Sequence, residues 1–302
     1  MSTRNAYPAN ATRIQKFSEL YEFARAFADE HLGLLILLGD PGLGKSRVLE
    51  AAVGNKACWI NGTATAFGIY MQAYEFRDRP IVLDDVDSLY RDRRAVRLLK
   101  VLCQTDPVKT LTWTSNASAL QIRKIPQRFK THSHVAIIAN DWKSLDADVK
   151  ALDDRAHVLV FNPSPLEIHR QAAKWYGDPE IFAFVGQHLH NIEQHSFRTY
   201  VKASELKRAG LNWRNVVLTR AWAGTTLAVA RLQADPHFQT TETRVTEFIE
   251  AGHGCRATYF KHLQRLAPAE DIPEIELEHA TPPADFKIGA NRPAEVDKRV
   301  DF

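Results

Sequence analysis

Cysteine and long apolar runs are scarce in this chain of 302 residues. The three cysteines, Cys58, Cys103 and Cys255, are widely spaced and odd in number, which disfavours a disulfide framework or a zinc site. No apolar run approaches the about 20 residues that a membrane-spanning helix needs. The first residues, MSTRNAYPANATR, lack the apolar segment of a secretory signal. The sequence therefore predicts a cytoplasmic protein with reduced thiols and no membrane partner.

A strong excess of charge of either sign is also missing. Lysine and arginine number 39 against 36 aspartates and glutamates, a net charge of +3. This weak basic balance is compatible with nucleic-acid binding but does not require it. The chain is 45% apolar, which is enough for one large or two ordinary globular domains, and we expect two.

Short apolar runs alternate with helix-length segments in the first half of the chain. Residues 14–30 space their apolar side chains by three and four, as an amphipathic helix does. This alternation predicts an α/β fold with a parallel, doubly wound sheet. The run at 110–115, TLTWTS, predicts a more exposed strand in a hairpin inserted before the strand at 135–139. The expected sheet strands are Leu34–Leu38, Ala57–Ile60, Ile81–Leu83, Val135–Ala139 and Val158–Phe161.

No further strand is obvious after residue 164. The pattern predicts helices at 165–175, 179–190, 196–209 and 214–232. The last residues, rich in proline and carboxylates, predict a disordered tail.

Residues 39–46, GDPGLGKS, match the pattern G-x-x-x-x-G-K-[ST] between a predicted strand and a predicted helix. Glycines let backbone N–H groups surround phosphate oxygens at the positive end of the helix. Lys45 would neutralise the β- and γ-phosphates, and Ser46 would bind Mg²⁺. The alternative is a strand–turn–helix corner with a solvated lysine. The predicted nucleotide-binding residues are Gly39, Asp40, Pro41, Gly42, Leu43, Gly44, Lys45 and Ser46.

An acidic pair ends the apolar strand in PIVLDDVDSL, residues 80–89. This is the pattern of a Walker B motif. Asp84 would hold Mg²⁺ together with Ser46, and Asp85 would polarise the attacking water. The alternative is that these carboxylates cap the following helix.

With both motifs and HVAIIAND at 134–141, the sequence resembles the AAA+ ATPases over about residues 12–210. The resemblance implies ATP and Mg²⁺ as ligands and a homo-oligomer, either a ring or a filament. It also implies that Asn140 holds the lytic water or the γ-phosphate. The family usually has glutamate where this chain has Asp85, and the shorter aspartate predicts slower turnover.

The same resemblance implies roles for two arginines and offers a third as an alternative. Arg155 is the candidate arginine finger, which would reach the nucleotide of the neighbouring subunit and stabilise the transition state. Arg198, on a helix of the lid, is the candidate sensor-2 residue and would contact the phosphates. Arg128 is the alternative finger. A solvated helix face is the other interpretation of each.

The segment TETRVTEFIEAGHGCRATYFKHLQRLAP at 241–268 resembles a helix-turn-helix of bacterial and phage DNA-binding proteins. The alternative is an ordinary helical hairpin with a basic solvated face. The hairpin insertion is also basic, and Lys124 and Arg128 are its candidates for binding nucleic acid. The alternative is that this basic face is solvated or contacts another subunit. The second helix would present to DNA the residues Arg256, Thr258, Lys261, His262 and Arg265.

The predicted organisation is an AAA+ α/β domain (1–164), a helical lid (165–235), a helix-turn-helix (236–268) and a disordered tail (269–302). The predicted function is ATP-driven remodelling of DNA or of a nucleoprotein complex in replication or mobile-element maintenance, with a replication or transposition protein as a partner. The alternatives are a superfamily-3-like DNA helicase and a non-hydrolysing DNA-bound adaptor. A third is a protein-remodelling member with Tyr70 or Tyr74 as an exposed pore aromatic.

Overall fold

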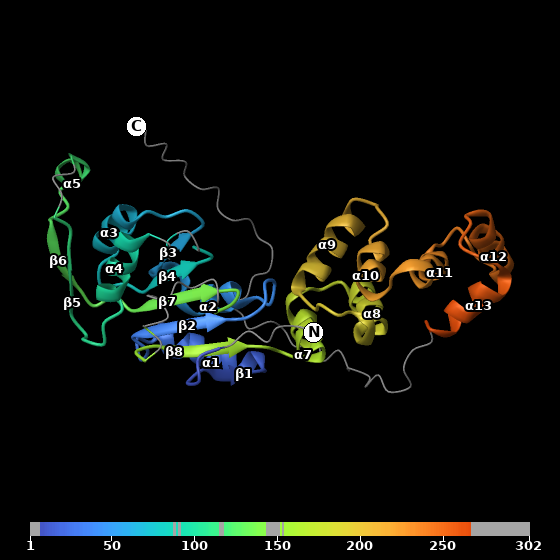
Figure 1. Cartoon of the computed structure of the whole chain (residues 1–302), viewed down its shortest axis with the longest axis horizontal. Coiled ribbons are helices and arrows are strands. Elements are labelled where there is room, and N and C mark those ends of the chain that lie inside the picture. Colours follow the sequence, from blue (N-terminus) through green and yellow to red (C-terminus); the bar gives the residue numbers. More distant parts are fainter. Residues whose placement is uncertain are drawn as a thin grey trace. The chain divides into compact units, whose positions relative to one another are not determined.

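The computed structural model describes residues 7–86, 89, 92–114, 118–142, 152 and 154–266. The chain divides into two compact units, unit 1 up to Ser164 and unit 2 from Pro165 (Figure 1). Unit 1 is α/β, and the described part of unit 2 is helical, so the predicted fold class is confirmed. The predicted tail at 269–302 lies outside the described residues. In the part of the chain that is described, no helix is both long enough and apolar enough to cross a bilayer.

Unit 1 is built on a six-stranded parallel sheet with the order β1-β8-β2-β7-β4-β3. Its elements are β1 (Thr12–Ile14), α1 (Phe17–Ala28), β2 (Leu34–Leu38), α2 (Lys45–Val53), η1 (Gly54–Lys56), β3 (Cys58–Asn61), α3 (Ala66–Glu75), β4 (Ile81–Asp84), α4 (Arg93–Leu102), β5 (Lys109–Thr112), α5 (Ser118–Ile122), β6 (Arg128–Thr131), β7 (Val135–Ala139) and β8 (His157–Phe161). The five predicted sheet strands are confirmed to within one residue at each end.

The sixth strand, β1, was not predicted. Ile14, expected at the start of the first helix, is instead buried in β1 and pairs with Phe161 of β8. The helix begins at Phe17. A three-residue edge strand is too short to show an alternation of buried and exposed residues. Its one buried side chain, Ile14, also fits the helical spacing of the residues that follow, so the helix was predicted to begin too early.

The sheet register brings three strand ends to the same edge. Leu38, the last residue of β2, pairs with Ala139 of β7, and Asp84, the last residue of β4, pairs with Ile138. Because β7 lies between β2 and β4, the segments that follow these three strands are neighbours. Every residue of β2 and β7 is buried, which explains why both read as uninterrupted apolar runs.

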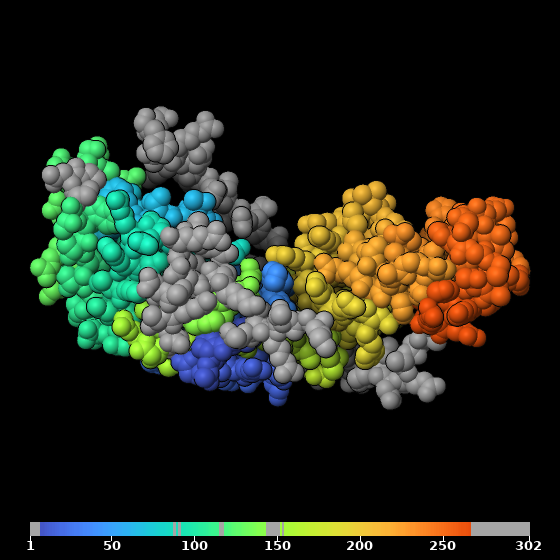
Figure 2. All heavy atoms as spheres, in the orientation of Figure 1, coloured from blue at the N-terminus to red at the C-terminus, as the bar shows by residue number. Residues whose placement is uncertain are grey.

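Strands β5 and β6 form the predicted antiparallel hairpin, which lies at the surface of unit 1 (Figure 2). Aromatic rings fix it to α3: Tyr70 packs against Trp113 and Phe129, and the Tyr70 hydroxyl donates a 2.8 Å hydrogen bond to the Pro126 carbonyl. Tyr70 is fully buried. The expectation of an exposed pore aromatic at Tyr70 is therefore wrong. Tyr74 is partly buried against Phe129.

Unit 2 comprises α7 (Pro165–Trp175), α8 (Pro179–Gln187), η3 (Leu189–Asn191), α9 (Phe197–Arg208), α10 (Arg214–Ala221), α11 (Gly224–Ala234), α12 (Thr241–Glu250) and α13 (Arg256–Gln264). The single helix predicted at 214–232 is wrong. Trp222 and Ala223 are both extended and separate α10 from α11. The helical spacing of apolar side chains continues across this break, so the pattern did not reveal it.

A buried histidine lies in the core of unit 2. His169 stacks on Phe182 with a ring separation of 3.8 Å, and its Nδ1 lies 2.7 Å from the Tyr200 hydroxyl. Burial, aided by nearby His195, lowers the pKa of His169 to about 4. The native protein therefore keeps this ring neutral well below neutral pH.

We expect His169 to make unit 2 sensitive to acid. The unfolded chain takes up a proton near the ordinary histidine pKa of about 6.5, whereas the folded ring stays neutral down to about 4. Stability should therefore fall as pH drops through this window, by at most about 3 kcal/mol from this group. Urea unfolding at pH 7.5 and pH 5 would measure the fall. A His169→Gln variant should be less stable at pH 7.5 but lose less between the two pH values.

Candidate functional site

The glycine-rich loop connects β2 to α2 and folds around its own lysine. Lys45 is the first residue of α2 and is only 5% exposed. Its Nζ donates hydrogen bonds of 2.6 Å to the Gly39 carbonyl and 2.9 Å to the Asp40 carbonyl. Gly44, the N-cap, has a left-handed φ of 76° that suits glycine. The ammonium group thus lies within the loop and is not solvated.

Gly39 allows the loop to pass close to β8. A Cβ at this position would lie 2.5 Å from the Phe161 carbonyl oxygen, and the residue has a φ of +156°. No other residue fits without displacing backbone. The glycine at this position is thus required by the approach of two backbones.

We expect Gly39→Ala to destabilise unit 1 by about 1–3 kcal/mol because the loop or β8 must move. It should also weaken nucleotide binding, since the displaced segment carries the carbonyl that holds Lys45. Gly33→Ala is the matched control, since a Cβ there meets nothing within 4 Å. Thermal unfolding with and without ATP measures both effects. Equal melting temperatures for the two variants would contradict the close approach.

The carboxylate at the end of β4 meets the first turn of α2. The Ser46 hydroxyl hydrogen-bonds to Asp84, and the Lys45 ammonium attracts it. Burial has the larger effect, however, and with the negative charge of Asp85 it raises the pKa of Asp84. A hydroxyl and a desolvated carboxylate together are oxygen ligands of the kind that Mg²⁺ binds, so these residues fit a magnesium ion.

Asp85 and Asn140 form a second polar pair beside Asp84. The Asn140 Nδ2 donates a 3.2 Å hydrogen bond to Asp85 Oδ1, across 55 residues of sequence. Asp85 has a φ of 57°, a left-handed conformation that aspartate adopts more readily than most residues. Its backbone N–H points to the Ile138 carbonyl at 3.4 Å. The structure therefore brings Lys45, Ser46, Asp84, Asp85 and Asn140 to one edge of the sheet.

A cavity of about 250 Å³ opens beside Gly39 and Asp40. Sequence reasoning missed it because its walls come from segments that become neighbours only when β1 pairs with β8. Tyr7 and Arg13 supply an aromatic ring and a cation to this cavity. It is lined by Tyr7, Arg13, Ile14, Gln15, Gly39, Asp40, Val160, Phe161 and Asn162.

Arg155 lies at the opposite edge of the sheet from the glycine-rich loop. It precedes β8, whose first residue, His157, pairs with Leu35 near the start of β2, whereas the loop follows Leu38 at the end of β2. The Arg155 side chain is 39% exposed, and its Nε lies 3.8 Å from Asp154 Oδ1. It is therefore remote from the glycine-rich loop of its own unit.

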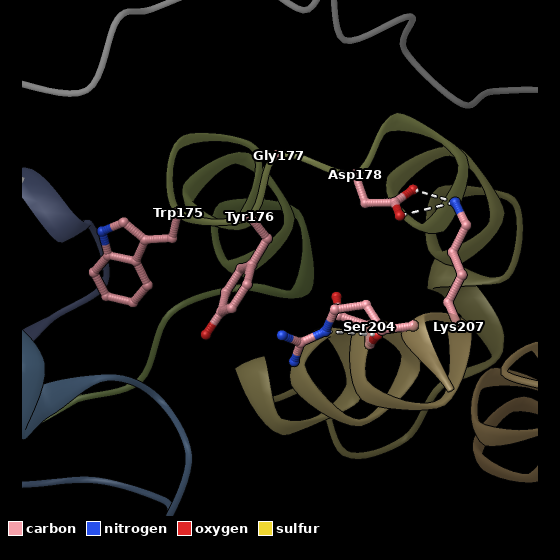
Figure 3. A pocket seen from close by; sticks show the side chains of 7 residues that line it. Trp175, Tyr176, Gly177, Asp178, Ser204 and Lys207 are labelled. Atoms are coloured by element: carbon pink, nitrogen blue, oxygen red, sulfur yellow. Dashed lines mark hydrogen bonds and ion pairs between the residues drawn. The ribbon is translucent and has the colours of Figure 1, made fainter. Parts of the chain in front are cut away.

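Arg198 is exposed on the first turn of α9 in unit 2. Lys207 anchors the last turn of the same helix, with 2.8 Å hydrogen bonds to both carboxylate oxygens of Asp178 (Figure 3). It also forms a 2.7 Å ion pair with Glu180. A cavity of about 410 Å³ lies beside this anchor, between the α7–α8 turn and α9. The sensor-2 role of Arg198 stays a prediction.

Helices α12 and α13 pack with α11 around a small core of Val229, Val245, Phe248 and Tyr259. The residues predicted to bind DNA lie on α13 and just after it. Arg256 is exposed but forms a bidentate ion pair with Glu242 at 2.7 and 2.8 Å, and His262 Nδ1 lies 2.8 Å from the Thr226 hydroxyl. Lys261 and Arg265 are exposed, and Thr258 is partly buried.

The hairpin residues predicted to grip nucleic acid are both exposed. Lys124 has a left-handed φ of 54° in the turn after α5, and Arg128 is the first residue of β6. Arg128 and Lys130 share the outward face of the ribbon, since Phe129 between them is buried. The ribbon thus presents cations on the side that faces away from α3.

No family model matches the chain. Among curated proteins, the chain is 28% identical over 148 residues to an uncharacterized 36.7 kDa protein in the nrdC-mobD intergenic region of Enterobacteria phage T4. The match spans 45% of this chain and 45% of that relative, less than half the length of either.

Solved structures with a similar arrangement share little sequence. One, from a study of katanin self-assembly, has 14% identity and a TM-score of 0.38, with 86% of this chain and 85% of that chain covered. A point variant of Thermotoga maritima RuvB has 13% identity, a TM-score of 0.42 and coverage of 78% and 76%. The FIGL-1 AAA domain has 14% identity, a TM-score of 0.33 and coverage of 84% and 81%.

Proposed function

We propose that this protein is a Mg²⁺-dependent ATPase of the AAA+ type that acts on DNA as a homo-oligomer. The observation that carries the proposal is the meeting of Lys45, Ser46 and Asp84 at one edge of the sheet. The Asp85–Asn140 pair lies beside them. The position of β7 between β2 and β4 also supports it, because this places Asn140 between the two nucleotide-contacting motifs.

The residues divide the chemistry of ATP hydrolysis between them. Lys45 would leave its two carbonyl partners for the β- and γ-phosphates, while the N–H groups of the loop and the start of α2 hold the phosphate oxygens. Mg²⁺ held by Ser46 and Asp84 would neutralise phosphate charge. Asp85 would accept the proton of the attacking water, and Asn140 would orient that water. The cavity at Tyr7 and Arg13 would take the base and ribose.

The position of Arg155 supports the proposal of an oligomer. A finger at the far edge of the sheet does not serve the site of its own subunit, so we assign it to a neighbour's nucleotide. Arg198 would act as sensor 2 from the helical lid, and lid motion on hydrolysis would move the bound substrate.

DNA is the proposed substrate because exposed cations lie on two separate surfaces. Lys261 and Arg265 lie at the end of the second helix of the proposed helix-turn-helix, and Lys124 and Arg128 lie on the hairpin. The phage origin of the curated relative supports a role in replication or mobile-element maintenance. The basic hairpin also suits the alternative of a superfamily-3-like helicase. A non-hydrolysing DNA-bound adaptor is the other alternative, since Asp85 replaces the usual glutamate.

Phosphate release from ATP, with and without single- or double-stranded DNA at fixed salt, tests the proposal. Wild type should hydrolyse ATP, and Lys45→Ala should lose about 100-fold or more of that turnover. Salt must be fixed because phosphate-backbone binding depends steeply on it. ATP binding without phosphate release would favour the adaptor, and strand displacement on a forked duplex would favour the helicase.

A further inference from the structure

Helix α4 carries arginines where helix energetics disfavour them. Arg93 and Arg94 lie in its first turn, where the helix dipole is positive and acidic residues are favoured. Arg97 lies one turn further on the same face, so like charges repel at the spacings i, i+3 and i, i+4. The capping Asp92 accepts a hydrogen bond from the Arg94 backbone N–H but does not offset three cations. Both effects of these charges on the helix itself are unfavourable.

These three side chains, which we call the α4 basic face, point into solvent. Arg93, Arg94 and Arg97 are all exposed, and no hydrogen bond or ion pair of their guanidinium groups is present among the residues that the structure describes. Several other exposed arginines are paired: Arg123 with Glu75 and Arg256 with Glu242. Within the part of the chain that the structure describes, no acidic partner thus occupies the α4 basic face.

The opposite side of α4 is fixed in the core of unit 1. Ala95, Val96, Leu98, Leu99 and Leu102 are all buried there. The helix is therefore a rigid support, and its three arginines lie on the side away from these buried residues. A preorganised row of cations binds a polyanion at a lower entropic cost than cations on a flexible loop do.

We propose that the α4 basic face binds the phosphate backbone of duplex DNA. Arg93 and Arg97 are about 6 Å apart along the helix axis, and each strand of a duplex presents a phosphate about every 3.4 Å of its axis. The face therefore spans about two phosphate intervals, or up to three successive phosphates of one strand. Arginine, present at all three positions, bonds phosphate oxygens through two N–H groups at once. This surface deepens the proposed function by adding a duplex contact on unit 1, and it rests on that function.

The test is duplex binding by the full chain across a salt series. The triple variant Arg93→Gln, Arg94→Gln, Arg97→Gln should bind duplex at least about tenfold more weakly than wild type at 0.1 M salt. The slope of log K against log salt should become shallower by about 3, because each phosphate neutralised by an arginine accounts for about 0.9 of that slope. The triple Arg→Lys variant should keep most of the slope because it keeps the charge. The Gln variant should melt at the wild-type temperature or above, since like-charge repulsion is removed.

Net charge is controlled with a second triple variant, Arg25→Gln, Lys56→Gln, Lys174→Gln, which removes three exposed cations elsewhere. This control should bind duplex nearly as wild type does. The inference is overturned if the α4 variant binds as wild type does, if the control weakens binding as much, or if wild type binds no duplex. Loss of self-association with unchanged duplex binding would also overturn it. ATP hydrolysis by wild type distinguishes failure of this inference from failure of the proposed function. If wild type does not hydrolyse ATP, the proposed function fails whatever the duplex-binding result.

Discussion

Arg155→Ala is expected to lower ATP turnover by about a thousandfold, the usual effect of losing an arginine finger. The fold should be unchanged because the side chain is partly exposed and its ion pair with Asp154 is long. ATP binding should also be retained, since the residue lies at the far edge of the sheet from the loop of its own subunit. Phosphate release and ATP affinity, measured on the same preparation, check both parts.

Mixing two inactive variants tests whether the finger acts between subunits. Lys45→Ala lacks the lysine of the glycine-rich loop but keeps Arg155. Arg155→Ala keeps that lysine but lacks the finger. When the two variants are mixed in equal amounts and assemble at random into closed oligomers, about one quarter of the sites would combine an intact glycine-rich loop with a neighbour's Arg155. Turnover should therefore reappear on mixing, whereas Arg25→Ala, a surface control, should remain fully active alone. If the mixture stays inactive while the variants co-assemble, the assignment of Arg155 fails.

Asp84→Asn is expected to separate function from stability. Turnover with Mg²⁺ should fall about 100-fold or more because a neutral amide holds the metal poorly. The empty protein should unfold at the same temperature or a higher one. The pKa of Asp84 is raised, mainly by burial, so its ionised form is disfavoured in the fold and opposes stability at neutral pH. Asparagine has the same shape without the charge.

The measurements are phosphate release over a Mg²⁺ titration and thermal unfolding without nucleotide. Asp78→Asn gives a matched control from unit 1 with the opposite expectation. The His132 backbone N–H bonds to Asp78 and lowers its pKa, so its charge is favourable in the fold and its loss should cost stability but little activity. A marked loss of stability in Asp84→Asn, or unchanged turnover, would contradict the assignment.

The motif residues could be predicted because the sheet is parallel. Strands buried on both faces read as uninterrupted apolar runs, and polar residues directly after them fall at one edge. This pattern places Lys45, Asp84 and Asn140 together from the sequence alone. The close pairing of Asp85 with Asn140 was not predicted, since it depends on β7 lying beside β4 and on the left-handed conformation of Asp85.

What could not be predicted depends on contacts between distant segments. The cavity beside Gly39 needs the pairing of β1 with β8, and the three residues of β1 carry too little pattern to show it. Burial of Tyr70 needs the hairpin to fold back across 56 residues of sequence. The helical pattern predicted that Arg256 would be available to bind DNA. The turn between α12 and α13 instead brings Glu242 into an ion pair with it.

Side chains attach the β5–β6 hairpin to α3 at several points. Its aromatic contacts with Tyr70 and Tyr74 tie it to α3, and the Pro126 carbonyl is held by the Tyr70 hydroxyl. Tightly packed interiors transmit strain with little compliance. A force on the tip of the ribbon would therefore act first on α3. It would then reach β4, the next strand in the chain, which ends at Asp84.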